Sequence, residues 1–106
     1  MYDVLIKNGR VIDPSQNMDD SLDIGITGNK ISVVAQDIAP QQSQQVIDAS
    51  NKIVTAGIID LHCHVAGGLQ TLGVDPDAAG VTQGVTTVVD GGSTGESIFV
   101  GFPRYV

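Results

Sequence analysis

Residues 57–65 constrain the fold of this chain most, because they hold both of its histidines at the end of a short apolar run. Successive side chains of a strand point to opposite faces, so on a strand Asp60, His62 and His64 share one face and the apolar residues share the other. Two histidines so spaced have Cβ atoms roughly 6 to 7 Å apart and can converge on one ion, whereas a helix would splay them about 200° apart. The segment therefore predicts a strand that carries two metal ligands, His62 and His64.

Two other interpretations of this histidine pair exist. The histidines can stand by chance in a solvated hairpin, or lie in a core as hydrogen-bonded neutral rings. The flanking residues 53–54 and 58–59 are apolar, however, and a polar row inside an apolar segment needs a compensating partner. This favours metal ligation. Cys63 lies between the histidines but faces the other way, so we expect a buried apolar thiol there rather than a ligand.

Composition excludes several classes of protein. The 106 residues, 42% of them hydrophobic, suffice for one modest core. A net charge of −7 without clustered Lys or Arg argues against binding to nucleic acid or to an anionic membrane. One cysteine excludes an internal disulfide, and the sequence shows neither a signal-peptide pattern nor an apolar run of membrane-spanning length. We therefore expect a soluble, cytoplasmic protein.

The first half of the chain, residues 1–55, reads as short strands joined by turns. We expect two hairpins, with turns at Gly9 and at residues 28–29, a further turn at residues 49–51, and surface loops at residues 15–20 and 36–45. The predicted strands are residues 2–8, 10–12, 22–26, 30–34, 45–48 and 52–54. Many short strands at close spacing indicate a β-sandwich or roll.

The second half, residues 56–106, changes to a strand, loop, helix and strand, which is the pattern of a parallel βαβ unit. Asp75 is a good N-cap and Pro76 a good first helical residue, and Gly84 is placed to end the helix before a strand at residues 85–90. Gly80 should weaken that helix by about 1 kcal/mol relative to alanine.

Sites in parallel α/β barrels lie at the carboxyl ends of the strands. His64, the glycine-containing loop at residues 66–73 and the turn at residues 90–93 all fall at such an end. We expect residues 66–73 to form a flexible site loop rather than a phosphate cradle, because their glycines match no phosphate-binding motif. Asp90 either lines the site or is an ordinary acidic residue at the start of a loop.

The aromatic residues near the end of the chain have two interpretations. Phe99, Phe102 and Tyr105 either pack in the core, which we prefer, or form an exposed cluster. The strand at residues 85–90 carries no charge before Asp90 and no proline, so it would leave an unprotected edge. An exposed cluster beside such an edge predicts self-association, as a homo-oligomer.

Several segments resemble one family. Residues 57–65, Gly-Ile-Ile-Asp-Leu-His-Cys-His-Val, resemble the first barrel strand of the amidohydrolase superfamily, the metal-dependent hydrolases related to dihydroorotase and urease. Residues 3–14 and 84–90 also resemble that family, so the resemblance covers essentially the whole chain. Residues 73–77, 90–93 and 101–106 are similar to its dihydroorotase-like deacetylase branch.

The resemblance implies a fold of two parts. It implies the N-terminal part of a composite β-sandwich domain, followed by the first strand–helix–strand of a TIM-like (β/α)₈ barrel. A complete barrel takes about 250 residues. We therefore expect an N-terminal fragment of a longer enzyme.

The resemblance also implies a chemistry. A bound zinc or other divalent metal, as one or two ions in the complete enzyme, lowers the pKa of a bound water toward about 7 and polarises a carbonyl. Of the family's ligands only His62 and His64 are matched here. Asp60 matches an acidic residue that supports the site in the family, and a plain structural role under the histidines fits it equally well. The other ligands, a carboxylated lysine, two histidines and a catalytic aspartate, belong to later strands. We therefore expect no catalytic residue in this chain and no activity from it alone.

The implied substrate is a small-molecule amide, cyclic amide or N- or O-acyl compound. The implied reaction is hydrolysis of a carbon–nitrogen bond other than a peptide bond, or deacetylation. The alternative is a non-catalytic β-rich module that pairs with another chain, in which the histidines are relics.

Overall fold

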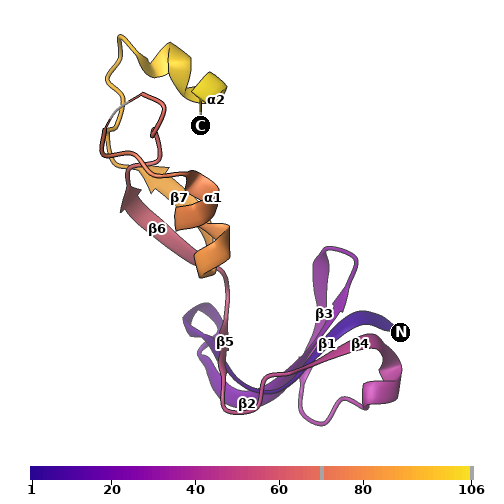
Figure 1. Ribbon diagram of the computed structural model, residues 1–106. Helices are drawn as coiled ribbons and strands as arrows, with labels where there is room; N and C mark the ends of the chain where they lie inside the picture. The colour runs from indigo at the N-terminus through magenta and orange to yellow at the C-terminus, as the bar shows by residue number, and fades with distance from the viewer. Residues whose placement is uncertain (70, 106) are drawn as a thin grey trace. The chain divides into compact units, whose positions relative to one another are not determined.

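The computed structural model describes residues 1–69 and 71–105, without the side chains of residues 104 and 105. The chain divides into two compact units, Met1–Ala56 and Gly57–Val106. Among the described residues, no helix has the length and apolar character needed to cross a membrane. Each unit is built around its own sheet (Figure 1).

The first unit is a mixed five-stranded sheet centred on its first strand. Its strands are β1 (Tyr2–Asp13), β2 (Met18–Thr27), β3 (Lys30–Ala35), β4 (Ser43–Asp48) and β5 (Ile53–Thr55). The order is β3-β2-β1-β4, and β5 pairs with the remaining length of the β1 edge that β4 uses. β2 is antiparallel to β1 and β3, whereas β4 and β5 run parallel to β1. The described residues of this unit form one sheet, so the second layer of a β-sandwich stays a prediction.

The predicted turn at Gly9 is wrong, because β1 continues through it. The register with β2 shifts between Ile6 and Gly9, so that two residues of β1 oppose Asp23 alone, which is the geometry of a β-bulge. Asn8 takes the positive φ of 64° at the bulge, and its amide donates to Asp23 Oδ1 at 2.8 Å. Gly9 is buried in the strand, where a Cβ would lie 2.5 Å from Val54 Cγ2. Close packing therefore requires this glycine.

The two predicted loops of this unit are shorter than expected. A 3₁₀ turn, η1 (Pro14–Gln16), leads directly into β2 at Met18, and a second, η2 (Pro40–Gln42), leads into β4 at Ser43. Polar residues at these strand starts stay in the sheet because their side chains remain at the surface. Asp19, for example, is exposed and accepts from Arg10 Nε at 2.7 Å across the β1–β2 pair. The predicted turns at residues 28–29 and 49–51 are confirmed.

A buried carboxylate holds the bulge of β1 in place. Asp23 is only 4% exposed, and its carboxylate accepts hydrogen bonds from Lys7 Nζ, the Asn8 amide and the Ile38 amide. Burial alone would raise the pKa of Asp23, but these bonds, led by the one from Lys7, lower it below 3.8. The Lys7 ammonium also donates to the Ile38 carbonyl at 2.7 Å. This network joins β1, β2 and the chain after β3.

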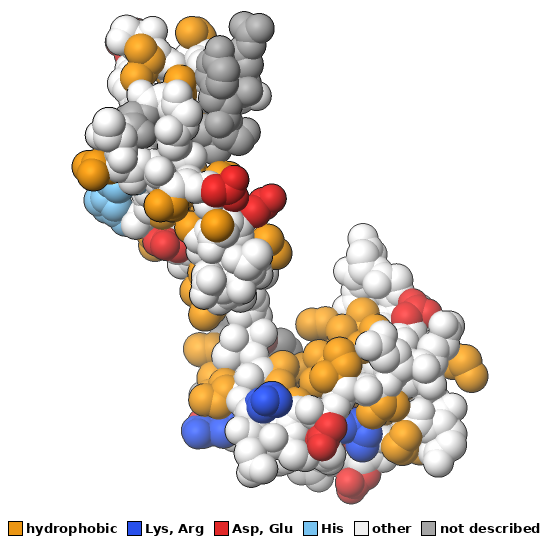
Figure 2. Space-filling view, viewed as in Figure 1, with side chains coloured by type: hydrophobic (Ala, Val, Ile, Leu, Met, Phe, Trp, Pro, Cys, Tyr) orange, Lys and Arg blue, Asp and Glu red, His pale blue; other side chains and the backbone are white. Residues whose placement is uncertain are grey.

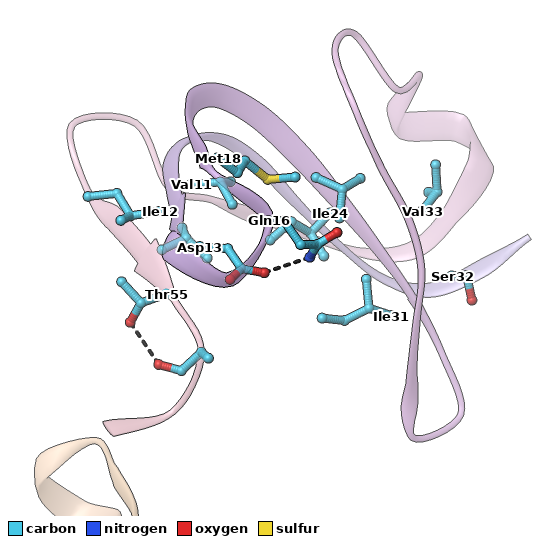
Figure 3. A pocket seen from close by; sticks show the side chains of 13 residues that line it. Val11, Ile12, Asp13, Gln16, Met18, Ile24, Ile31, Ser32, Val33 and Thr55 are labelled. Atoms are coloured by element: carbon cyan, nitrogen blue, oxygen red, sulfur yellow. Dashed lines mark hydrogen bonds between the residues drawn. The ribbon is translucent and has the colours of Figure 1, made fainter. Parts of the chain in front are cut away.

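One face of the first unit carries an open groove of about 570 Å³ (Figure 3). Most of its lining is apolar, with side chains that come from β1, β2, β3 and β5. Among these are Val11, Met18, Ile24, Ile31, Val33 and Val54. Ile31 remains 66% exposed, so this face of the sheet is covered only in part by the described residues.

The second unit is a parallel strand–helix–strand unit, as predicted. Its elements are β6 (Ile58–Cys63), α1 (Pro76–Ala79), η3 (Val81–Gln83), β7 (Val85–Asp90), η4 (Phe99–Gly101) and α2 (Phe102–Tyr105). β6 and β7 pair in parallel. The predicted N-cap is confirmed, because Asp75 Oδ1 accepts from the Asp77 and Ala78 amides at 2.9 and 3.0 Å, and Pro76 is the first helical residue.

The predicted end of that helix at Gly84 is wrong. α1 ends at Ala79, and Gly80 has φ −100° and ψ −99°, outside the helical region. A Cβ on Gly80 would lie 2.6 Å from the Pro76 carbonyl oxygen, so this break in the helix requires a glycine, the residue that was expected only to weaken the helix. The chain then continues through η3 to Gly84, whose positive φ of 81° turns it into β7.

The aromatic residues near the end of the chain are not all core residues. Phe99 and Phe102 stack with ring centroids 5.9 Å apart, but Phe99 is 58% exposed. The preferred prediction of core packing is therefore wrong for Phe99. The side chain of Tyr105 lies outside the described residues, and self-association stays a prediction.

Candidate metal centre

The end of β6 brings the two histidines together. His62 lies on the strand and His64 just beyond its last residue, Cys63. Their ring centroids are 5.4 Å apart and the ring planes meet at 74°. His62 is exposed and His64 half-buried, and histidine side chains reach the surface (pale blue in Figure 2). Two imidazoles thus stand side by side at an accessible strand end.

Asp60 supports this strand end through the backbone. Its Oδ1 accepts from the His62 amide at 3.0 Å. This bond joins residues two apart on the same strand, so it restrains the backbone that carries the His62 ring. The Asp60 carboxylate is thus bonded to the backbone of the strand that carries His62.

Asp90 ties the end of β7 to the residue that follows His64. Its Oδ2 accepts from the Val65 amide at 2.9 Å, and its Oδ1 accepts from the Gly92 and Ser93 amides at 3.0 and 2.6 Å. Burial would raise the pKa of Asp90, but hydrogen bonds from Ser93, Val65 and Gly92 outweigh burial and lower the pKa to about 2. The carboxylate is therefore ionised at neutral pH.

Ser93 contacts His64 directly, and sequence reasoning missed it. Its Oγ lies 3.0 Å from His64 Nδ1, and the residue is 7% exposed. A serine three residues after a carboxylate, at the end of the strand beside the histidine strand, was the available signal. The spacing became informative only with the parallel pairing of β6 and β7.

Gly91 packs closely against the His62 ring. Its amide donates to the Cys63 carbonyl at 2.7 Å, which holds the turn against the end of β6. A Cβ on Gly91 would lie 2.5 Å from His62 Cδ2 and 2.6 Å from His62 Nε2. The backbone of Gly91 therefore approaches the His62 ring too closely for any residue with a Cβ atom to replace it without a shift.

The prediction of a buried thiol at Cys63 needs correction. Cys63 is half-buried, and its Sγ lies 3.4 Å from the Val89 carbonyl oxygen. Partial burial, together with the charges of Asp60 and Asp90, raises the pKa of this thiol. A thiolate, the form that binds metals, is therefore disfavoured at Cys63.

The loop at residues 66–73 starts and ends beside the histidines. The Val74 amide donates to the His64 carbonyl at 2.8 Å, and a Cβ on Gly73 would lie 2.3 Å from the Gly67 amide nitrogen. Close backbone approach at the base of the loop therefore requires Gly73. The flexibility expected of this loop stays a prediction, and Gln70 lies outside the described residues.

The residues present fit a zinc ion in part. Neutral imidazoles are good zinc ligands, and His64 Nδ1 already has a protein partner in Ser93. Within residues 1–69 and 71–105, no third His, Cys, Asp or Glu side chain is grouped with them. Catalytic zinc sites usually have three protein ligands. The described residues thus supply two candidate ligands of a larger set.

The chain is similar to curated hydrolases, although no family model matches it. It is 39% identical over 89 residues to a dihydroorotase of Sulfurihydrogenibium sp. (strain YO3AOP1), which covers 81% of this chain and 21% of that protein. It is also 39% identical over 87 residues to a deacetylase of Agrobacterium fabrum, with coverage of 81% and 21%. The chain thus spans about a fifth of the length of these relatives.

Solved structures give the same result. An adenine deaminase matches with a TM-score of 0.78 and 34% identity over 99% of this chain and 27% of its own. An N-acyl-D-glutamate deacylase from Bordetella bronchiseptica, solved with zinc and a phosphonate inhibitor, matches with a TM-score of 0.63 and 30% identity over 82% of this chain and 18% of its own. Sequence relatives and structural neighbours agree, and the chain belongs to the amidohydrolase superfamily.

Proposed function

We propose that this chain supplies two metal ligands, His62 and His64, to an enzyme that hydrolyses a carbon–nitrogen bond other than a peptide bond. The observation that carries the proposal is the pair of imidazoles 5.4 Å apart at the end of β6, with the Asp90 turn bonded to the backbone on both sides of His64. Zinc, when bound, would polarise a carbonyl and allow a water to act as a nucleophile at neutral pH.

The residues around the histidines have defined tasks in this proposal. Asp60 restrains the backbone at His62, and Gly91 packs closely against the ring of that residue. Asp90 anchors the Val65 amide, which follows His64 directly. In the fold that accompanies the proposal, β6, α1 and β7 begin a (β/α)₈ barrel, and Met1–Ala56 contribute one sheet of a β-sandwich domain. The cytoplasm is the proposed location.

The substrate class in this proposal is a small molecule with a cyclic amide or an N-acyl group. It draws on relatives and neighbours named as dihydroorotase, deacetylase and N-acyl-D-glutamate deacylase. The described residues carry two candidate ligands and no third, so the remaining ligands and the group that accepts the proton are proposed to come from outside them.

Zinc titration by calorimetry tests the assignment of the ligands. We expect weak binding of one zinc ion, because two imidazoles form an incomplete ligand set. His62→Ala and His64→Ala should each reduce the affinity by about tenfold or more, and the double variant should bind no zinc at this site. Cys63→Ser is the matched control on the same strand and should bind zinc as the unchanged chain does. Stoichiometric, submicromolar binding by the double variant would refute the assignment.

We expect no hydrolase activity from these 106 residues alone. The physical reason is that no third metal ligand is grouped with the histidines within the described part of the chain. The assay is zinc-dependent hydrolysis of N-acyl amino acids and cyclic amides by the purified chain. Turnover that disappears in the His64→Ala variant would contradict this expectation.

A further inference from the structure

We propose that Asp90 is a positioning residue for His64 and that it acts on the backbone rather than on the ring, with both of its carboxylate oxygens needed. The inference rests on the proposed function of His64 as a metal ligand and adds the side chain that directs this ligand. A peptide unit is planar, so the two units that flank a residue set its Cα and the direction of its Cα–Cβ bond. Holding both units therefore limits where the imidazole can point.

Hydrogen bonds hold both peptide units beside His64. In the unit before it, the carbonyl accepts from the Gly91 amide at 2.7 Å. In the unit after it, the His64 carbonyl accepts from the Val74 amide at 2.8 Å, and the Val65 amide donates to Asp90 Oδ2 at 2.9 Å. Of these three bonds, two come from backbone partners, and the one to Asp90 can be changed by a side-chain substitution.

The Val65 amide depends on this acceptor. Val65 is only 3% exposed, and the residue after it, Ala66, is fully buried. Water therefore replaces the carboxylate poorly, and a buried amide that loses its acceptor is costly. Without Asp90 the chain at Val65 has to move toward another partner, and His64 is the residue directly before it.

The same carboxylate also shapes its own turn, which uses its second oxygen. Asp90 Oδ1 accepts from the Gly92 and Ser93 amides at 3.0 and 2.6 Å, while Oδ2 accepts from Val65. An asparagine side chain has the same shape but only one acceptor oxygen, because an NH₂ donor replaces the other. In either orientation at least one backbone amide would face a donor. The orientation that keeps two of the three bonds releases Val65.

A matched control follows from the use of one oxygen instead of two. Asp75 accepts from the Asp77 and Ala78 amides at the same atom, Oδ1. Asparagine caps a helix about as well as aspartate, so Asp75→Asn should preserve this cap. Asp90→Ser is a second test variant. A serine hydroxyl can accept from amides within the turn, but its single oxygen cannot also hold Val65.

Nuclear magnetic resonance of the metal-free protein measures both the bond and the position of the ring. In Asp90→Asn and Asp90→Ser, the Val65 amide should exchange with solvent about tenfold faster or more, because a hydrogen bond to a charged acceptor is lost. The nuclear Overhauser effect between the rings of His62 and His64, whose centroids lie 5.4 Å apart, should weaken. Amides within β6 and β7 should keep their protection, and Asp75→Asn should change none of these quantities.

Calorimetric titration with zinc measures the consequence for the metal. Both Asp90 variants should bind zinc about tenfold more weakly, the lower end of the range for residues that support a metal ligand, because Asp90 acts through the backbone. Asp75→Asn should bind zinc like the unchanged protein.

These measurements separate the inference from the proposed function. An unchanged ring-to-ring effect or an unchanged zinc affinity in both Asp90 variants would overturn the role of Asp90. General loss of protection in β6 and β7 in both variants would overturn it too, because Asp90 would then hold the whole unit rather than position His64. If the unchanged protein binds no zinc, the proposed function fails, whereas the spectra of the metal-free protein still decide whether Asp90 positions the ring.

Discussion

Replacing Gly91 with alanine should reduce zinc affinity by about 100-fold, the upper end of the range for residues that support a metal ligand. The new methyl carbon would lie 2.5 Å from His62 Cδ2 and 2.6 Å from His62 Nε2, far inside van der Waals contact. The ring or the turn has to move, and either movement disturbs the present arrangement of His62 and His64. Gly91 does not have a positive φ, so alanine is not strained by the backbone itself. Calorimetric zinc titration measures the effect.

The same loop offers a matched control for this substitution. A Cβ on Gly95 meets nothing within 4 Å, so Gly95→Ala should bind zinc like the unchanged protein. Gly92 is unsuitable as a control because its φ of 102° would strain alanine. Equal zinc affinity in Gly91→Ala and Gly95→Ala would show that the close packing of Gly91 against His62 does not contribute to zinc binding.

Replacing Asp23 with alanine should cost about 3 to 5 kcal/mol of unfolding free energy, the range for breaking a buried ion pair. Lys7 would lose its carboxylate partner, and the Asn8 and Ile38 amides would lose their acceptor. Asp19→Ala is the matched control, because Asp19 pairs with Arg10 at the surface, where such pairs contribute at most about 1 kcal/mol. Urea unfolding followed by circular dichroism compares the two. Similar losses in both variants would contradict the buried network.

The contribution of Asp23 should depend on pH with a definite sign. The folded-state pKa of Asp23 lies below its ordinary value of 3.8, so folding favours the ionised carboxylate. Stability from such a group is fully present above the unfolded-state pKa and is lost as the pH falls through the folded-state pKa. The difference in stability between the unchanged chain and Asp23→Ala should therefore shrink below about pH 4. A difference that stays constant down to pH 2 would contradict the lowered pKa.

Local signals in the sequence predicted the second unit better than the first. Asp75 and Pro76 start a helix through contacts within one turn, and the structure confirms both. Asn8 and Gly9 form a dipeptide that is among the strongest hairpin signals. In the folded chain, however, the residues on both sides of this dipeptide pair with β2, and Val54 packs against Gly9. Pairing of β1 with β2 along most of its length, together with packing against Val54, outweighed the local preference of these two residues.

The histidine pair could be found from strand alternation alone, but its supports could not. The contact between Ser93 and His64 joins residues 29 positions apart and depends on how β7 aligns with β6. Register of a parallel pair is set by packing over the whole unit rather than by any short motif. Gly91 was part of a segment matched to the family, but the sequence does not show that its backbone lies close to the His62 ring.

The two edges of β1 are filled by residues from very different distances along the chain. β2 follows β1 through η1, whereas Val4 pairs with Gln45 and Arg10 with Ile53. Closing a longer loop costs more chain entropy, so the antiparallel strands β1, β2 and β3 should assemble first. The other edge of β1 is paired by β4 and β5. During synthesis it therefore stays at least partly unpaired until Thr55, the last residue of β5, has left the ribosome. In that interval the strand can pair with a neighbouring nascent chain, so crowded polysomes should favour misassembly of this protein.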